Sequence, residues 1–243
     1  MRIPRVYVST ALTANSECEL PEDAAHHVHT VLRLRIGAEL IAFDGQGGEY
    51  PGEVTTVHRR GVSVLLGAWR DVERESPLNV TLLQGISRGE RMDYTLQKAV
   101  ELGVTAIVPV ITERTVVNLK ADRVDRRLGH WQRIISTACE QCGRNRVPPL
   151  RDVVTFDHLL NGEAPIAGLL LVGNAPDGLP DWRRAVPPIS LMVGPEGGLS
   201  ELEQRRAVAR GYQPVRLGPR VLRTETAALT ALAVLQSRYG DLS

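Results

Sequence analysis

The stretch MVGPEGGLSELE, residues 192–203, joins an apolar run to the start of a helix through one proline and three glycines. Glycine in a regular element costs roughly 0.5–1 kcal/mol relative to alanine, so this many glycines indicate a loop bent around something. Ser200 and Glu203 have the spacing of a capping box, which predicts a helix directly after the loop. A loop between a strand end and a helix start is a position where backbone N–H groups can hold a ligand. A tight loop without chemical purpose is the alternative.

A second stretch, LGPRVLRTETAALTALAVLQ at residues 217–236, repeats the pattern. A Gly-Pro pair again follows a strand-like run, and the helix expected after it is apolar on more than one face. Such a helix is buried in a core or against a partner chain. Arg220, Arg223 and Glu225 stand at its entrance, either as a structural ion pair or as part of a site.

The rest of the chain after Pro77 alternates between strand-like and helical patterns. Strands alternating with helices predict an α/β domain with a mainly parallel sheet, and ligands in such sheets bind at the carboxyl ends of the strands. Val193-Gly194 and Leu217-Gly218 are two such ends. The strands are expected over 79–86, 104–111, 166–172, 189–194 and 214–218, and the helices over 91–103, about 122–142, from Ser200, and to about Tyr239.

The first part of the chain, from Val6 to about Val72, is made of short β-prone runs. Two of them flank Asp44–Gly48, which is a hairpin signal, and Pro21 can open a helix with apolar residues at helical spacing. A small β-barrel with one helix is the natural interpretation. We therefore predict two domains, residues 1–72 and 73–243.

Composition limits the function classes. The 243 residues carry 29 Lys and Arg against 28 Asp and Glu, a net charge of +1, so no strong global attraction to a polyanion is expected. Aromatic residues make up 4%, which argues against RNA binding through a stacking platform and favours ionic contacts. No signal-peptide core or uninterrupted 18-residue apolar run is present, so we expect a cytoplasmic protein without a membrane partner. Cys139 and Cys142 have the spacing of half a zinc or redox motif but lack a second pair, and no metal is predicted.

Four motifs together resemble the RsmE family of SPOUT methyltransferases, which methylate N3 of one uridine in 16S ribosomal RNA of the small subunit. They are QKAVELGVTAIVPVITERT, ACEQCGRNRVPPL and the two Gly-Pro stretches, in this order along the chain. The resemblance covers nearly the whole sequence. It implies an N-terminal PUA-like β-barrel for RNA, a C-terminal SPOUT domain with a trefoil knot, a homodimer, and S-adenosylmethionine as the cofactor.

The resemblance also implies site residues. The cofactor would be lined by Leu171, Gly173, Val193, Gly194, Pro195, Glu196, Gly198, Leu217, Gly218, Leu222, Arg223, Thr224 and Ala227. Contacts to RNA are expected from Arg2, Arg5, Arg33, Arg35, Arg88, Gln141, Arg144 and Arg146.

The reaction itself requires a group that removes the N3 proton of uracil or stabilises the anion that forms. The acids considered for the first role are Glu101, Glu113, Glu140 and Glu225, and the arginines for the second are Arg88, Arg114, Arg144 and Arg223. We favour Arg114 and Arg223, with Glu225 as the weakest choice.

Two other functions were weighed against this enzyme. A non-catalytic ribosome-associated RNA-binding protein could share the fold, although the intact glycines of both loops argue against it. An α/β enzyme that holds a nucleotide phosphate at the same loop would need a phosphate-binding lysine there, and none is present.

Overall fold

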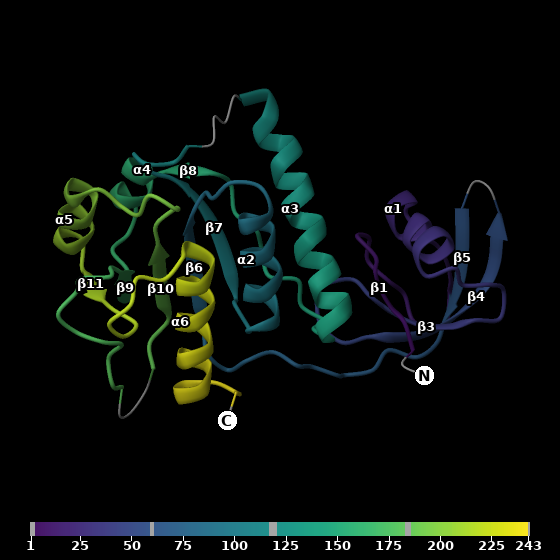
Figure 1. Cartoon of the computed structure of the whole chain (residues 1–243). Coiled ribbons are helices and arrows are strands. Elements are labelled where there is room, and N and C mark those ends of the chain that lie inside the picture. Colours follow the sequence, from purple (N-terminus) through teal and green to yellow (C-terminus); the bar gives the residue numbers. More distant parts are fainter. Residues whose placement is uncertain (1–2, 59–60, 117–120, 183–185, 243) are drawn as a thin grey trace. The chain divides into compact units, whose positions relative to one another are not determined.

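The structure is a computed structural model that describes residues 3–58, 61–116, 121–182 and 186–242; the side chains of 121–123 are not described. The chain forms two compact units (Figure 1). One comprises residues 1–75 together with 136–147, and the other comprises residues 76–135 and 148–243.

The N-terminal unit is built on a five-stranded sheet in the order β1-β3-β4-β5-β2. The strands are β1 (Arg5–Tyr7), β2 (Glu17–Glu19), β3 (Glu39–Phe43), β4 (Tyr50–His58) and β5 (Gly61–Leu66). β3 and β4 form the hairpin predicted at Asp44–Gly48, and β1 pairs with β3 in parallel. Alternate residues of these strands fill one core with Val28, Ala24 and Ala25 of the helical segment. This arrangement confirms the predicted β-barrel with one helix.

That helical segment changes its winding along its length. α1 (Glu22–His26) begins after Pro21 and continues as a π-helix, η1 (His27–Val31). Leu32 follows η1, and Arg33 then adopts a φ of 54°, a left-handed conformation that stops the helix. Val28 of η1 is fully buried in the core.

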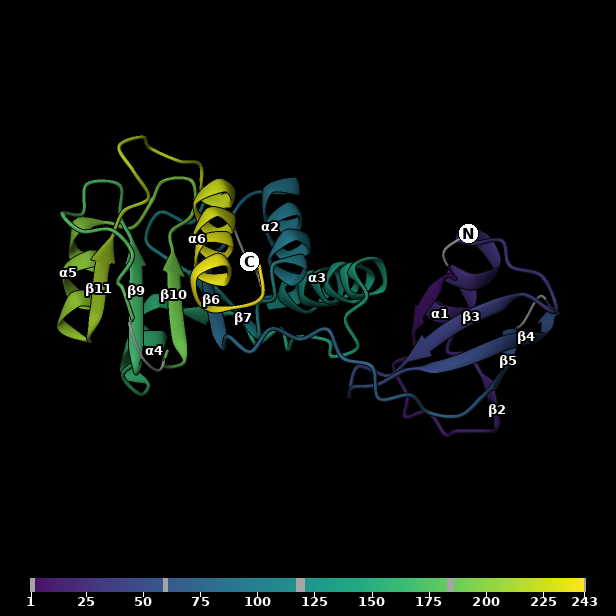
Figure 2. The ribbon, with the colours of Figure 1, turned by 90° about the horizontal axis from the view of Figure 1, so that it is seen from below.

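The C-terminal unit contains a six-stranded, wholly parallel sheet in the order β11-β9-β10-β6-β7-β8 (Figure 2). The strands are β6 (Val80–Gly85), β7 (Ala106–Ile111), β8 (Val154–Thr155), β9 (Ala167–Leu171), β10 (Ile189–Val193) and β11 (Tyr212–Val215). The helices are α2 (Glu90–Glu101), the first part of α3 (Ala121–Cys142), α4 (Phe156–Asn161), α5 (Glu201–Ala209) and α6 (Thr224–Tyr239). The predicted α/β class is confirmed.

Helices cover this sheet in two groups. α4 and α5 contribute Phe156, Leu160 and Ala207 to a core that also holds Leu83 of β6 and Leu170 of β9. α2 packs against α6, and both views show these two helices side by side (Figures 1 and 2). The strand order brings the carboxyl ends of β9, β10 and β11 together, and the loops that follow them are therefore neighbours.

The first unit runs to Glu75 rather than to the predicted residue 72, and it also includes a later segment of the chain. Residues 136–147, the end of α3 and the segment after it, belong to the N-terminal unit. The Tyr7 amide donates to Glu140 Oε1 over 2.9 Å, the Val147 amide donates to the Gly45 carbonyl over 3.3 Å, and Asn145 bonds to Arg5. These long-range bonds have no signature in the local sequence. The sequence therefore predicts one domain boundary and does not reveal that a later segment joins the first unit.

Candidate functional site

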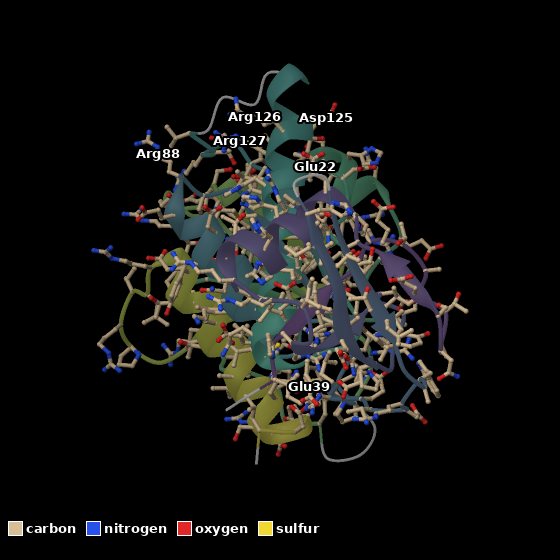
Figure 3. All side chains as sticks on the ribbon, turned by 90° about the vertical axis from the view of Figure 1, so that its right-hand side faces the viewer. Glu22, Glu39, Arg88, Asp125, Arg126 and Arg127 are labelled. Atoms are coloured by element: carbon tan, nitrogen blue, oxygen red, sulfur yellow. The ribbon has the colours of Figure 1, made fainter. Side chains whose placement is uncertain are left out.

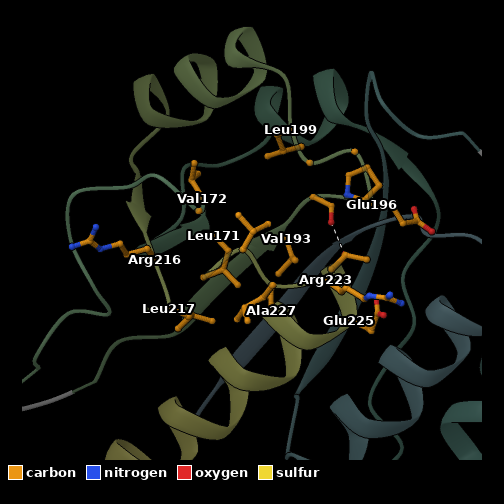
Figure 4. Close-up of a pocket in the computed structure, with 18 of the residues that line it drawn as sticks. Leu171, Val172, Val193, Glu196, Leu199, Arg216, Leu217, Arg223, Glu225 and Ala227 are labelled. Atoms are coloured by element: carbon orange, nitrogen blue, oxygen red, sulfur yellow. Dashed lines mark hydrogen bonds between the residues drawn. The ribbon is translucent and has the colours of Figure 1, made fainter. Parts of the chain in front are cut away.

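Three loops at the carboxyl ends of β9, β10 and β11 surround a cavity of about 510 Å³ (Figure 4). This volume lies within the range of roughly 300–1,000 Å³ that is usual for small-molecule sites. Apolar side chains of Leu171 at the end of β9, Val193 at the end of β10, Leu217 after β11 and Ala227 of α6 line it (Figure 4). All thirteen residues predicted to line the cofactor lie around this one cavity.

The β10 loop has no room for side chains at its first turn. A Cβ on Gly194 would lie 2.9 Å from Gly198 C and 2.9 Å from Leu199 N, both backbone atoms that cannot yield cheaply. The Gly198 amide closes the turn by donating to the Pro195 carbonyl over 2.8 Å, and Gly198 has a φ of 66°. Glycine is thus required at 194 by close backbone approach and favoured at 198 by conformation.

Other glycines leave space open toward the cavity. At Gly173, Gly198 and Gly218, each of which lines the cavity, an added Cβ would meet no atom within 4 Å. The absence of side chains at these positions therefore leaves empty space, which no other protein atoms fill. Such a cradle fits a ligand that contacts backbone N–H and C=O groups.

A buried hydrogen-bond chain ties the β10 loop to the start of α6. Thr224 Oγ1 donates to the Gly194 carbonyl over 2.6 Å, and Gln84 Nε2 donates to Thr224 Oγ1 over 3.0 Å. Gln84 lies at the end of the central strand β6, is fully buried, and also donates to the Gly85 carbonyl. Sequence reasoning missed Gln84, because a single glutamine in an apolar strand carries no motif.

The carboxylate of Glu196 is held at the edge of the cavity. Its Oε1 accepts from the Arg88 amide over 2.9 Å and from Arg91 Nη1 over 3.3 Å. Burial by itself raises the pKa of Glu196, but hydrogen bonds from the Arg88 amide and its own amide, with the Arg91 charge, lower the pKa below its ordinary value. Glu196 therefore stays ionised. Arg91, which also lines the cavity, was not among the predicted residues.

The three predicted catalytic residues lie in or beside the cavity. Arg223 and Glu225 line it (Figure 4), and Glu225 Oε2 is buried without a hydrogen-bond partner among the described residues. Arg114 does not line it; its Nη1 instead donates to the Gly197 carbonyl over 2.9 Å, so it braces the β10 loop from outside. A buried carboxylate oxygen without a partner is costly, which suits a group that meets a ligand.

Two of the residues predicted to contact RNA are internal. Arg5 is 9% exposed, with Nη1 2.6 Å from Glu49 Oε2 and its guanidinium over the Phe43 ring. Arg144 is 5% exposed, and its Nε bonds both carboxylate oxygens of Glu75 over 3.0 and 3.1 Å. The prediction of RNA contacts is corrected for both, because buried and paired guanidinium groups do not meet a polyanion at the surface.

The other predicted RNA contacts are distributed over the surface. Arg33 and Arg35 are exposed and line a shallow hollow of the N-terminal unit, Gln141 is exposed there, and Arg146 is exposed 3.7 Å from Glu73. Arg88 is exposed in the C-terminal unit. Arg2 lies outside the described residues.

The cysteines are free thiols that form no disulfide. Cys139 is fully buried, and burial chiefly raises its pKa to about 12. Within the described residues, no group of three His, Cys, Asp or Glu side chains is placed to hold a metal ion. No helix in the described part of the chain has the length and apolar character needed to cross a membrane.

Comparison with known proteins shows which protein families the chain matches. The RNA methyltransferase domain family matches residues 74–236, and the RNA methyltransferase PUA domain family matches residues 20–66. Ribosomal RNA small subunit methyltransferase E from Buchnera aphidicola is 32% identical, with 100% of this chain and 99% of the relative covered. The protein of that name from Bacillus subtilis is 32% identical over 88% of this chain and 87% of its own.

Solved structures give the same assignment. Ribosomal RNA small subunit methyltransferase E from Neisseria gonorrhoeae, bound to S-adenosyl methionine, is 41% identical with a TM-score of 0.91. A Legionella pneumophila protein in complex with SAM is 40% identical with a TM-score of 0.96, and both comparisons cover 100% of each chain. The fold and the cavity are those of an RNA methyltransferase. The chain belongs to the ribosomal RNA small subunit methyltransferase E family, which confirms the family predicted from the motifs.

Proposed function

We propose that the chain is an S-adenosylmethionine-dependent methyltransferase that modifies N3 of one uridine in 16S ribosomal RNA. The observation that carries this proposal is the cavity itself. The residues that the family resemblance assigned to the cofactor come from three separate segments, and all of them line one hollow. Two proteins at least 40% identical over their full length were solved with this cofactor.

The cavity residues suit S-adenosylmethionine, which supplies an electrophilic methyl group on a sulfonium when bound. Leu171, Val193 and Ala227 form an apolar wall against which an adenine ring can lie. The open faces of Gly173 and Gly218 leave backbone groups accessible to the ligand. The ionised Glu196 suits a ligand with hydroxyl donors and positive charge.

Uracil N3 carries a proton that must leave before or as it is methylated. Of the four carboxylates considered, Glu225 alone lines the cavity. Glu101 pairs with Lys98, and Glu140 belongs to the N-terminal unit. We assign proton acceptance to Glu225, and stabilisation of the negative charge on the uracil oxygens to Arg223 at the mouth of the cavity. Arg114 acts through the loop that it braces.

Transfer of labelled methyl from S-adenosylmethionine to small ribosomal subunits lacking the modification, followed by nucleoside analysis, tests the proposal. We expect 3-methyluridine as the product. Glu225→Gln keeps the shape of the side chain, so we expect it to retain cofactor binding and lose a factor of roughly 100 or more in turnover. Another methylated nucleoside would refute N3 of uridine, and unchanged turnover in Glu225→Gln would refute its role.

Three further parts of the proposal rest on the family. The protein is a cytoplasmic homodimer with a knotted C-terminal domain. The apolar character of α6 on several faces supports the dimer, because half-buried Leu229 and Val234 lie beside the buried Leu232 and Leu235. A monomer mass by light scattering at micromolar concentration would refute it. The non-catalytic RNA-binding alternative is not favoured, since the cavity is hollow where a degenerate one would be filled.

A further inference from the structure

A second hollow in the C-terminal unit lies between the start of α2 and the first half of α3. Its volume is about 610 Å³. Met92 and Trp131 form its floor and are 1% and 2% exposed. Three arginines of α3, Arg126, Arg127 and Arg133, stand along its wall. We name this hollow, with its three arginines and the loop 87–89 at its edge, the arginine groove.

Two of the three arginines share one face of α3, and Arg127 lies beside that face, four residues before Trp131. Arg126, His130 and Arg133 are spaced four and three residues apart, which places them on one side of an α-helix. Trp131 and Ile135 are spaced by four residues on the buried side. The sequence of α3 thus separates a packed side from a cationic side.

The acidic residue that lines the groove does not neutralise Arg126 or Arg127. Asp93 is the acidic residue that lines it, and its Oδ2 is already 2.9 Å from Nε2 of His130. Neither Arg126 nor Arg127 forms an ion pair with a carboxylate among the described residues. Asp125 is exposed beside them but does not line the groove. Figure 3 shows Arg126 and Arg127 at the same end of this unit as Arg88.

The groove and the cofactor cavity share one wall. Ser87 and Gly89 line the groove, whereas the amide of Arg88 between them donates to Oε1 of Glu196, which lines the cavity. The loop 87–89 therefore has the groove on one side and the cavity on the other. A polymer lying in the groove would have a neighbouring unit within reach of the cavity mouth.

The chemistry of the groove fits phosphodiesters. Guanidinium groups bind phosphate oxygens with paired N–H donors, and they carry no sequence information when they do so. Trp131 is buried and offers no surface for base stacking. We propose that the arginine groove holds the RNA sugar-phosphate backbone beside the nucleotide that is methylated. This inference rests on the proposed function and adds the path of the substrate.

The test is a double variant, Arg126→Gln with Arg127→Gln, compared with Arg205→Gln on α5 combined with Arg210→Gln directly after α5. Both control arginines are exposed in the same unit and lie outside the groove and the cavity, so the two proteins lose equal charge. Affinity for a 16S ribosomal RNA transcript is measured over a range of salt concentrations. KM and kcat for small ribosomal subunits, and calorimetric affinity for S-adenosylmethionine, are measured beside it.

We expect the groove variant to lose about 10- to 20-fold in RNA affinity at about 0.15 M salt, with the slope of log K against log salt reduced by about 1.5. KM should rise by a similar factor, while cofactor affinity stays at the wild-type value and shows that the variant is folded. The α5 pair should change RNA affinity by less than about threefold. Equal losses of RNA affinity in both variants, or no loss in either, would refute the proposal that the groove binds RNA. The proposed function itself is tested by the separate methyl-transfer assay. If the wild-type protein does not methylate RNA in that assay, the proposed function is refuted.

Discussion

Replacing Thr224 by valine tests whether the buried hydrogen-bond chain holds the cofactor loop. Valine has nearly the same shape, so the change removes the hydroxyl and little packing. Thr224 is 7% exposed, and its Oγ1 serves the Gly194 carbonyl over 2.6 Å and Gln84 Nε2 over 3.0 Å. Both partners are buried and would be left with one unmet hydrogen bond each.

The expected loss of stability follows from these two partners, the Gly194 carbonyl and Gln84 Nε2. A buried donor or acceptor without a partner costs about 1–3 kcal/mol. Gln84 Nε2 keeps its bond to the Gly85 carbonyl, so the lower half of the range applies to it. We expect Thr224→Val to lower the free energy of unfolding by about 2–5 kcal/mol. Without the hydrogen bond from Thr224 to Gly194, the β10 loop must also be ordered when the cofactor binds. If this ordering costs about 1.4 kcal/mol, the Kd for S-adenosylmethionine rises about tenfold.

The assays are urea unfolding followed by circular dichroism and calorimetric titration with S-adenosylmethionine. Thr224→Ser restores the hydroxyl and should recover most of the lost stability and affinity. If Thr224→Val unfolds at the wild-type midpoint and binds the cofactor with the wild-type Kd, the hydrogen-bond chain does not position the loop. If Thr224→Ser is as impaired as Thr224→Val, the methyl packing rather than the hydroxyl is responsible.

Three other expectations come from close contacts and titrating groups. Gly85→Ala should fail to accumulate as a folded protein or lose cofactor binding, because its Cβ would lie 2.5 Å from the backbone N of Pro195; calorimetry and expression yield show it. Cys139 should stay unmodified by a thiol reagent at pH 8 until the protein is unfolded, because burial chiefly raises its pKa to about 12; mass spectrometry after brief labelling measures this. Burial chiefly raises the pKa of Glu140, so its ionised form costs stability as pH rises through and above the usual carboxyl range. Glu140→Gln keeps an acceptor for the Tyr7 amide and should be at least as stable as wild type at pH 7, with the difference vanishing at pH 4 in urea unfolding; lower stability at pH 7 would contradict this.

Local patterns in the sequence are enough for most elements of the fold. The capping box of Ser200 and Glu203 is formed as predicted, and α5 begins at Glu201. α3 and α6 end at Cys142 and Tyr239, where helical periodicity stops. The short elements β8 and α4 went unpredicted, because two and six residues are too few for a periodic signal.

The cavity was predictable for a different reason. Its glycines serve backbone conformation and close approach, and both requirements leave a visible mark in the sequence. Gln84 and Arg91 leave none, since their roles depend on which strand and loop ends lie opposite them. Gln84 meets Thr224 across 140 residues, and Arg91 meets Glu196 across 105. Contacts at such separation are set by strand order and not by spacing.

Arginine clustering in the sequence was a poor guide to which arginines are exposed. Arg144 and Arg146 are two residues apart, yet one is buried against Glu75 and the other is exposed near Glu73. The chain is nearly neutral overall, so a local excess of positive charge depends on which carboxylates are already engaged. Arg126 and Arg127 were not predicted, although both line the arginine groove next to the loop that borders the cavity. In a balanced protein, we therefore expect the surface that meets RNA to be set by the arginines that remain outside internal ion pairs after folding.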